Sequence, residues 1–374
     1  MVYKIVPIIF LASLFIYCLS VLIYIIGARV RENRNLSTKT QRVSVIVSLK
    51  NEENRVDKLV EYLVNQDYPK EYYEIIIIDN NSTDNTYNKL LSYQNKFPNL
   101  RVFTTRNINS NLRFKKQAID LGIKNASGDI ILSTDADCHI KEKWISTMVK
   151  YFNDDIGFVI GCSLLKHKNN LFTMLQSLDF MLLMNAARSV ANLGIPWACN
   201  GHNIGFRKSL YEKIGGYSNI ARLVGGDDSV FMNLLIKKTK TKAVFADDKH
   251  SWITSDTLTS LKDFLFQRIR WSTDANYMHK INPVFFTVIL ATFLSNLSFL
   301  IMPVFSSFIP YFIGGILLKF FLEFIHCYQS LKFFNEKGLV KVFPLWFILE
   351  IPYIVFMGIL SFWGNSISWY RNRK

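Results

Sequence analysis

The sequence lacks the patterns that mark a disulfide framework, a zinc site, an internal repeat or a low-complexity linker. Its 5 cysteines are scattered without a Cys-x-x-Cys pair, which fits a reduced domain that faces the cytoplasm. Acidic residues are also scarce, because 29 Asp and Glu stand against 44 Lys and Arg and give a formal net charge of +15. This balance favours polyanionic partners: nucleic acid, an anionic lipid leaflet or phosphate-bearing substrates.

Charge is absent from the segment Ile5–Gly27, which is long enough to cross a bilayer with some tilt. A cleaved signal peptide would have a shorter apolar core and a small-residue cleavage site after it. The segment is followed instead by arginines: Arg29, Arg31 and Arg34. We therefore expect an uncleaved anchor over residues 1–28, with the chain after it in the cytoplasm.

A second uncharged region extends from Ile281 to Leu318. It is too long for one membrane span, so we expect two spans, roughly 284–303 and 305–325. Proline favours a break between them, near Pro303 or Pro310.

The second of these spans holds Lys319 and Glu323, which are four residues apart and can pair on one helix face. A third span is expected between Val342 and Trp369, interrupted by Glu350. Either Glu350 is buried in a helix bundle, or the span begins after it and the residues before it lie at the membrane interface. We therefore expect about three spans in a C-terminal membrane region, residues 281–374. The basic tail "RNRK" favours the cytoplasm, a preference that three spans would not satisfy.

Residues 43–252 alternate β-branched runs with helical patterns. Buried strands are expected at "VSVIVSL" (43–49), "EIIIIDN" (74–80) and "DIILSTDAD" (129–137). This alternation predicts an α/β fold with a parallel, doubly wound sheet, in a cytoplasmic domain over residues 40–280. Such sheets bind ligands at the carboxyl ends of their strands.

Acids and amides gather at three of these strand ends. They are Asn51, Glu52 and Glu53, then Asp79, then Asp135 and Asp137. Any one of them can be an ordinary loop residue or helix cap, as "NSTDNT" alone suggests. Together in one crevice, these carboxylates would repel each other unless a cation lies among them, and a hard divalent ion suits oxygen ligands.

Six blocks in this order resemble the membrane-bound family 2 glycosyltransferases, which include cellulose, chitin, hyaluronan and poly-N-acetylglucosamine synthases and ceramide glucosyltransferases. The blocks are "VSVIVSLKNEEN", "EIIIIDNNSTDNT", "FKKQAIDLGIKNASGDIILSTDADC", "CNGHNIGFRKSLYEKIGGY", "GGDDSVFMNLL" and "QRIRW". The resemblance covers about residues 40–275. It implies a GT-A fold, a Rossmann-like nucleotide-diphospho-sugar transferase domain, with a Mg²⁺ or Mn²⁺ ion and inversion at the anomeric carbon.

The resemblance also implies roles for donor-binding residues. Asn51 and Glu52 match the contact to the nucleotide base, and Asp79 matches the acid that holds the uridine. Lys115 matches a lysine that contacts the nucleotide after a glycine. Phe114 replaces that glycine, which leaves the path of the loop open.

The resemblance places the metal and the base among the remaining acids. Asp135 and Asp137 match the DxD pair, with Asp137 as the direct metal ligand. Asp228, which follows Asp227, matches the Glu-Asp pair that supplies the base, although the pair here is Asp-Asp. Such a base is needed because an acceptor hydroxyl is a weak nucleophile until a carboxylate takes its proton. His202 either contacts the acceptor or is a core histidine.

The block "QRIRW" lies in a helical pattern just before the second uncharged region. Gln267, Arg270 and Trp271 are at i, i+3 and i+4 and share one face. We expect Arg270 to bind diphosphate oxygens, and Gln267 and Trp271 to contact the acceptor. Arg268 is expected on another face as an interfacial anchor, and an interfacial role for the whole helix is the alternative.

The leading hypothesis is an inverting glycosyltransferase that moves a sugar from a UDP-sugar to a lipid or lipid-linked glycan at the cytoplasmic face of the inner or plasma membrane. The alternative within this class is a processive polysaccharide synthase. A membrane nucleotidyltransferase would not need the "QRIRW" helix, and a transporter subunit would have many spans with paired broken helices. The expected partners are the donor, the acceptor and membrane lipids, and nucleic acid is not among them.

Overall fold

The computed structural model describes residues 2–30 and 35–362, which divide between two compact units. The sheet unit comprises the described residues of Glu32–Lys166 and Ala198–Asp256. The helical unit comprises those of Met1–Arg31, His167–Trp197 and Thr257–Arg373. Two helical segments that the sequence-based division places in the cytoplasmic domain thus group with the membrane helices. Arg31, Arg34 and the tail "RNRK", which entered the topology argument, lie outside the described residues.

The sheet unit is built on a seven-stranded sheet. In spatial order its strands are β3 (Leu100–Thr104), β2 (Tyr73–Asp79), β1 (Val43–Leu49), β4 (Ile130–Asp135), β8 (Asn203–Arg207), β6 (Ile156–Gly161) and β9 (Lys242–Ala246). β3, β2, β1 and β4 are mutually parallel, but β8 is antiparallel to both β4 and β6. The expectation of a wholly parallel sheet is therefore wrong at β8. The chain enters β8 after leaving the sheet unit for residues 167–197, so no crossover helix of the sheet unit sets its direction.

The strand register brings the predicted strand ends level with one another. Leu49 of β1 pairs with Asp79 of β2, and Ser48 of β1 pairs with Asp135 of β4. Parallel strands in this register end at one edge of the sheet, so Asp79, Asp135 and the loop after Leu49 share that edge. A second, three-stranded sheet contains β5 (Cys138–His139), β10 (Ile253–Asp256) and β7 (Ser163–Lys166).

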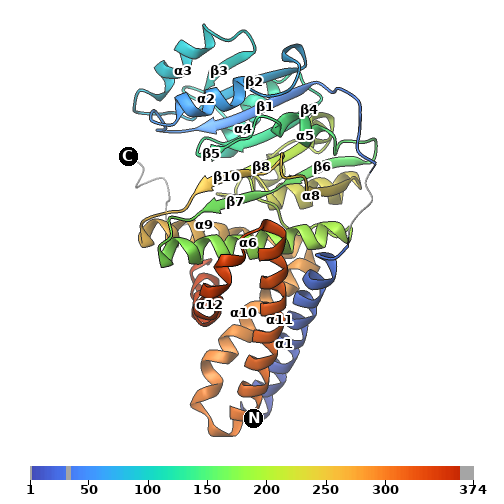
Figure 1. Ribbon diagram of the computed structural model, residues 1–374, viewed down its shortest axis with the longest axis vertical. Coiled ribbons are helices and arrows are strands. Elements are labelled where there is room, and N and C mark those ends of the chain that lie inside the picture. Colours follow the sequence, from blue (N-terminus) through green and yellow to red (C-terminus); the bar gives the residue numbers. More distant parts are fainter. Residues whose placement is uncertain (1, 31–34, 363–374) are drawn as a thin grey trace. The chain divides into compact units, whose positions relative to one another are not determined.

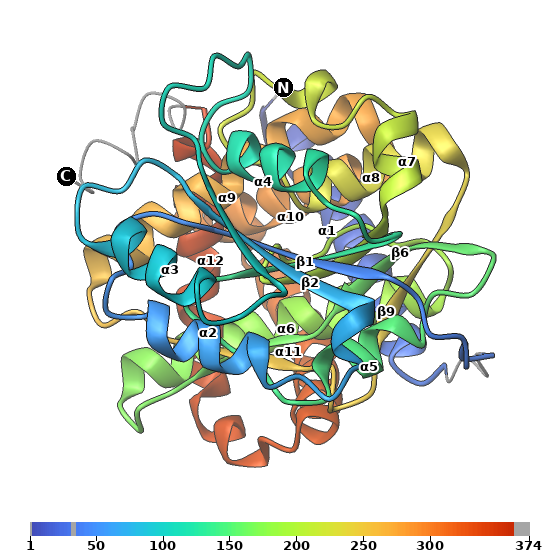
Figure 2. The ribbon, with the colours of Figure 1, turned by 90° about the horizontal axis from the view of Figure 1, so that it is seen from above.

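Helices cover both faces of the seven-stranded sheet. They are α2 (Val56–Val64), α3 (Thr86–Gln94), α4 (Lys115–Lys124), α5 (Trp144–Val149), α7 (Lys208–Lys213) and α8 (Ser229–Thr239), with 3-10 turns at Lys70–Tyr72 and Ser218–Ile220. Figure 2 shows α2, α3 and α5 on one side of the sheet and α4, α7 and α8 on the other.

Alternation along β1 and β2 explains this layering. Val45 and Ile77 face α2, whose apolar residues are buried in the same cluster. Ile46 and Ile78 face α4 on the other side, where a Cβ on Gly122 would lie 2.9 and 2.6 Å from their side chains. Gly122 therefore lets α4 approach the sheet closely, and this helix carries Lys115 at its first turn.

The helical unit consists of six long helices: α1 (Val2–Gly27), α6 (Leu171–Asn192), α9 (Leu261–Ile281), α10 (Pro283–Ile301), α11 (Ile309–Phe334) and α12 (Phe343–Leu360). Within this unit, α6 and α9 run roughly across the direction of α1, α10 and α11 (Figure 1). Short 3-10 segments at Met302–Val304, Ser306–Phe308 and Lys337–Val342 connect the last helices.

Within the part of the chain that the structure describes, four segments are long and apolar enough to cross a membrane: Val6–Gly27, Pro283–Val304, Ser306–Phe334 and Lys337–Leu360. One N-terminal and three C-terminal candidate spans are what the sequence predicts. The break between α10 and α11 falls at Met302–Phe308, which contains Pro303 and ends two residues before Pro310, the two expected hinge prolines. Asn282 separates α9 from α10 and caps α10, since its side chain accepts a hydrogen bond from Phe285 N at 3.1 Å.

The charged residues of these spans pair with each other in the interior of the helical unit. Lys319 and Glu323 pair on α11 at 2.5 Å, as the spacing predicts, and Lys319 also contacts Glu350 of α12 at 2.7 Å. Tyr17 of α1 donates a hydrogen bond to Glu323. The first alternative for Glu350 is therefore the one observed, since Glu350 is buried among helices rather than at the start of a span.

Candidate active site

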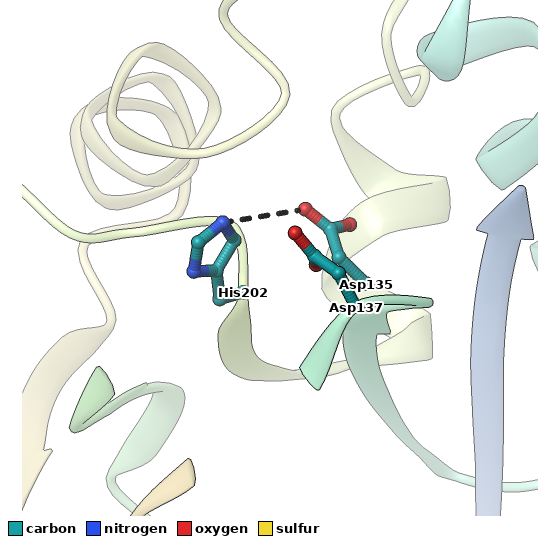
Figure 3. Close-up of side chains that lie close together, drawn as sticks. All are labelled: Asp135, Asp137 and His202. Carbon is teal, nitrogen blue, oxygen red and sulfur yellow. Dashed lines mark ion pairs between the residues drawn. The ribbon is translucent and has the colours of Figure 1, made fainter. Parts of the chain in front are cut away.

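Asp135 and Asp137 lie directly at the end of β4 and meet His202 from the loop before β8. One potential ligand atom from each of these three residues lies within 4.8 Å of the other two. His202 Nε2 is 3.7 Å from Asp135 Oδ2, and Figure 3 shows the imidazole facing the two carboxylates. None of the three side chains is fully buried. Two carboxylates and an imidazole around one small space form a donor set that suits a divalent cation.

Lys115 links this cluster to the Asp227–Asp228 pair. Its ammonium lies 2.7 Å from Asp135 Oδ1 and 3.1 Å from Asp227 Oδ2. Burial by itself lowers the pKa of Lys115, but the carboxylates of Asp135 and Asp227 outweigh it, so this pKa is raised well above its usual range. Lys115 therefore places a positive charge between Asp135, one of the candidate metal ligands, and Asp227.

The backbone before Lys115 explains how a lysine is held at this position. Phe114 has φ 60° and ψ −142°, a conformation that favours glycine. Phe114 thus keeps a glycine-like path, which answers the question left open by the sequence. The next residue, Lys116, is buried and donates hydrogen bonds to the carbonyls of Leu223 and, at 2.6 Å, Gly225. These bonds tie the start of α4 to the loop that leads to Asp227.

Asp228 caps α8 and is more accessible than its neighbour. Its carboxylate accepts hydrogen bonds from Ser229 N at 2.5 Å and Gly201 N at 3.2 Å. Asp227 is only 7% exposed, whereas Asp228 is partly exposed. Because a base must reach the acceptor hydroxyl, this difference favours Asp228 over Asp227 for that role.

The loop before β8 is held by a buried hydrogen-bond network. Asn203 accepts from Trp144 Nε1 at 3.0 Å and donates to the carbonyls of Cys162 and Ser251, each at 2.9 Å. Ser229 at the start of α8 bonds both the amide and the carbonyl of Cys199. The backbone at Gly201 and His202 is therefore fixed on both sides. A Cβ on Gly201 would lie 3.4 Å from Lys115 Nζ and 3.5 Å from Asp228, so this glycine lies between the two side chains.

The residues expected to hold the nucleotide lie at the ends of β1 and β2. Asn51 N donates to Ser82 Oγ at 2.9 Å, and Asn51 Oδ1 accepts from Thr83 N at 2.8 Å. Glu52 N donates to Thr86 Oγ1 at 2.9 Å. These bonds join the loop after β1 to the loop after β2, so the two loops form one rigid edge.

Asp79 itself is fully buried at that edge. It accepts hydrogen bonds from Ser82 N at 3.3 Å and Thr104 Oγ1 at 3.3 Å, and Arg106 Nε lies 4.0 Å away. The sheet unit thus brings together every candidate that the sequence places in it, in two adjoining groups at the carboxyl ends of the strands.

The thiol next to Asp137 is not a candidate nucleophile. Cys138 is buried, and burial together with Asp137 and Asp135 raises its pKa well above the usual range. It therefore remains a protonated thiol at neutral pH, which argues against covalent thiol chemistry at this site.

Gln267, Arg270 and Trp271 lie on α9 in the helical unit, and all three are partly buried. The expectation for Arg268, an interfacial anchor on another face, is wrong. Arg268 is 3% exposed, pairs with Asp179 of α6 at 3.0 Å and lies over the Trp271 ring at 4.4 Å. Arg268 and Trp271 are three residues apart, as Gln267 and Arg270 are, so the same helical spacing also brings Arg268 and Trp271 onto one face of the helix.

Sequence reasoning missed Asp179 and did not predict that His202 lies beside Asp135 and Asp137. Asp179 is the single acid in the largely apolar stretch Leu171–Asn192, whose other charged residue is Arg188, and this is a signal that could have identified a buried partner for a basic residue. His202 was assigned to the acceptor or the core, whereas the structure places it beside the metal-type acids.

Comparison with known proteins agrees with this site. The family model "Glycosyl transferase family 2" matches residues 44–215. The dolichyl N-acetyl-alpha-D-glucosaminyl phosphate 3-beta-D-2,3-diacetamido-2,3-dideoxy-beta-D-glucuronosyltransferase of Methanococcus voltae is 34% identical over 29% of this chain and 33% of its own. The beta-monoglucosyldiacylglycerol synthase of Nostoc sp. is 25% identical over 62% of this chain and 48% of its own. The chain therefore spans from a third to about half of the length of these relatives.

A solved structure shares the fold over nearly the whole chain. The mannosyltransferase PcManGT from Pyrobaculum calidifontis, in complex with GDP-Man and Mn²⁺, superposes with a TM-score of 0.63 at 17% identity and covers 96% of this chain and 99% of its own. The mixed sheet with its strand-end acids is thus a GT-A fold. Residues 44–215 form a glycosyltransferase family 2 domain, which joins one N-terminal and three C-terminal candidate membrane spans.

Proposed function

We propose that the protein is an inverting glycosyltransferase that moves a sugar from a UDP-sugar to a lipid or lipid-linked glycan at the cytoplasmic face of the membrane. The observation that carries the proposal is the linked set Asp137, Asp135, Lys115 and Asp227–Asp228 at the carboxyl ends of the strands. In this set, Lys115 links the residues that suit a divalent cation to the Asp227–Asp228 pair.

Asp135, Asp137 and His202 would hold a Mg²⁺ or Mn²⁺ ion. The fit rests on the short mutual distances of their ligand atoms and on the mixed oxygen and nitrogen donors. Such an ion supplies positive charge to the leaving diphosphate. His202 is then a metal ligand, which replaces its assignment to the acceptor.

Asp228 acts as the base. It takes the proton of the acceptor hydroxyl as the new glycosidic bond forms on the face of the sugar opposite the diphosphate, and the bond to the diphosphate breaks. Bonds from Ser229 N and Gly201 N orient its carboxylate. Asp227, paired with Lys115, is the less accessible member.

The donor is held by two sets of residues. Asn51, Glu52 and Asp79 bind the uridine at the rigid edge formed by the loops after β1 and β2. Lys115 and, from α9, Arg270 contact the phosphates, where a guanidinium provides paired donors to phosphate oxygens.

The acceptor is proposed to be a lipid because of the spans and the relatives. The Methanococcus voltae relative is named for a dolichyl phosphate acceptor and the Nostoc relative for a glucosyldiacylglycerol product. Gln267 and Trp271 would contact the acceptor, with Trp271 as its platform. Arg29, beside the first span, favours a cytoplasmic sheet unit.

A processive polysaccharide synthase is the second candidate, favoured by similarity to a poly-beta-1,6-N-acetyl-D-glucosamine synthase of Staphylococcus epidermidis. The four candidate spans provide few helices to line a channel for a polymer, which favours the transfer of a single sugar. The two candidates differ in product length.

The test uses the purified full-length chain in nanodiscs with Mn²⁺, a panel of UDP- and GDP-sugars, and two acceptors, dioleoylglycerol and polyprenyl-phosphate-linked N-acetylglucosamine. Mass spectrometry reads the products. We expect one added sugar on one lipid from a UDP-sugar. A ladder of sugars would favour the synthase, and transfer only from GDP-sugars would overturn the donor assignment. Release of pyrophosphate in a separate sample with UTP and a sugar phosphate would identify a nucleotidyltransferase.

A further inference from the structure

Arg268 is the more deeply buried of the two charged residues in the "QRIRW" block, and it contacts both Asp179 and the ring of Trp271. Its guanidinium pairs with Asp179 of α6 at 3.0 Å while the side chain is 3% exposed. Its carbon centre lies 4.4 Å from the centroid of the Trp271 ring and 5.0 Å from that of Phe264. The planar guanidinium of Arg268 thus contacts an acid on α6 and two aromatic rings on α9, the helix to which Arg268 belongs.

Asp179 is itself held in place from a third helix. Trp346 of α12 donates its Nε1–H to Asp179 Oδ1 at 3.2 Å, while Arg268 contacts Oδ2. The neighbouring residue Phe180 packs against Trp271 with ring centroids 6.0 Å apart. Consequently α6, α9 and α12 jointly restrict the orientation of the Trp271 ring.

We infer that the Asp179–Arg268 ion pair is a positioning device that sets the orientation of the Trp271 indole as the acceptor platform. The inference rests on the proposed function, in which Trp271 contacts the acceptor. A guanidinium over one side of the ring stabilises it by cation–π attraction and restricts its rotation. Arg268 acts through Trp271 and contacts no reacting atom.

A purely structural role for Arg268 would be the neutralisation of buried Asp179, which any cation of suitable length can supply. Arg268→Lys separates the two roles, because lysine keeps the charge for Asp179 but lacks the planar fork that stacks on the ring. The matched control is Lys262→Gln, which removes an exposed cation from the same helix.

The first measurement needs no acceptor. The contribution of Trp271 to the near-ultraviolet circular dichroism of the full-length chain is obtained by subtracting the spectrum of Trp271→Phe. We expect Arg268→Lys to lose most of this contribution with little change in thermal unfolding, and Lys262→Gln to retain it. An unchanged Trp271 contribution in Arg268→Lys would overturn the inference.

The second measurement is a cycle of variants with the lipid that accepts sugar in the panel above. We expect Arg268→Lys to raise the acceptor KM about tenfold, with hydrolysis of donor by water unchanged. In a Trp271→Ala background the same substitution should have no further effect on KM. An equal effect in both backgrounds contradicts positioning through Trp271.

Failure of the proposed function gives a different result. If Trp271→Ala leaves the ratio of transfer to hydrolysis unchanged, Trp271 is not an acceptor platform, whatever Arg268 does. If Arg268→Lys does not fold, Trp346→Phe removes the hydrogen bond to Asp179 and keeps an aromatic ring next to Phe343. It should shift both readouts in the same direction by a smaller amount, and no shift in either readout would count against the inference.

Discussion

Each unit of the molecule gathers carboxylates around a single lysine, and the two clusters differ in how open they are. In the helical unit, Lys319 is 0% exposed and joins Glu323 and Glu350. In the sheet unit, the Lys115 side chain is 25% exposed and joins Asp135 and Asp227. The same elementary interaction therefore occurs once in an interior and once at an open strand edge.

The difference indicates what each cluster is for. Lys319 and its partners connect α11 to α12, and Tyr17 adds α1 through its bond to Glu323. A buried pair of this kind favours one arrangement of helices, since a wrong arrangement would leave a charge unpaired in an apolar interior. In the sheet-unit cluster, Lys115 pairs with Asp135 and Asp227, and Asp137 lies beside Asp135. Carboxylates grouped at an accessible edge are suited to a cationic ligand.

The largest expected effect on activity is at the open cluster, the one around Lys115; the cluster around Lys319 is the closed one. Asp137→Asn removes one charged ligand of the proposed ion, and loss of several kcal/mol of charge stabilisation corresponds to about a thousandfold slower transfer. EDTA should produce a similar loss in the unaltered protein, and added Mn²⁺ should restore only the latter. Initial rates of sugar transfer provide the measurement. Full activity after dialysis against EDTA would remove the metal from the proposal.

Substitutions in the closed cluster should change the stability of the protein rather than the rate of sugar transfer. Lys319→Met leaves Glu323 and Glu350 buried without their cation, and breaking a buried pair in this way costs about 3–5 kcal/mol. Thermal unfolding of the chain in detergent should therefore fall. The control Lys319→Met with Glu323→Gln and Glu350→Gln removes all charges and should recover most of the loss. A stable Lys319→Met variant that lacks transfer activity would instead give the cluster a role in the reaction.

The two clusters also show what could be predicted from sequence. The strand ends and their acids were predictable because β-branched runs are local signals and parallel strands end at one edge. The pairing of Lys319 with Glu323 was predictable from a spacing of four residues on one helix.

The contact of Lys319 with Glu350 was not predictable, because it joins two helices whose relative register no local spacing reveals. The antiparallel direction of β8 and the burial of Arg268 were missed for the same reason. Both depend on partners distant in the sequence, such as Asp179 for Arg268.

The next effect in size distinguishes the two aspartates within the open cluster. Asp228→Asn keeps the size of the side chain but removes the proton acceptor, so transfer should slow by about a hundredfold. Donor affinity, measured by calorimetry with the UDP-sugar and Mn²⁺, should change little. Asp227→Asn is the matched variant and should mainly disturb Lys115. If Asp227→Asn is crippling and Asp228→Asn is mild, the roles of the pair are reversed.

The smallest effect concerns Lys115, which holds the central position in the open cluster that Lys319 holds in the closed one. The ammonium of Lys115 already neutralises Asp135 in the absence of donor, so it competes with a divalent ion for the same carboxylate. Its pKa is raised, so the lysine stays protonated throughout the neutral range and the competition should not vary with pH there. Lys115→Met should therefore bind Mn²⁺ about tenfold more tightly without donor, by removal of one nearby positive charge, while sugar transfer falls.

Lys115→Arg keeps the charge and should bind Mn²⁺ like the unaltered protein. Calorimetric titration with Mn²⁺ alone measures both variants. Weaker binding by Lys115→Met would mean that Lys115 supports the geometry of the acids rather than competing for them. The open cluster would then resemble the closed one, in which the lysine serves as a permanent part of the fold.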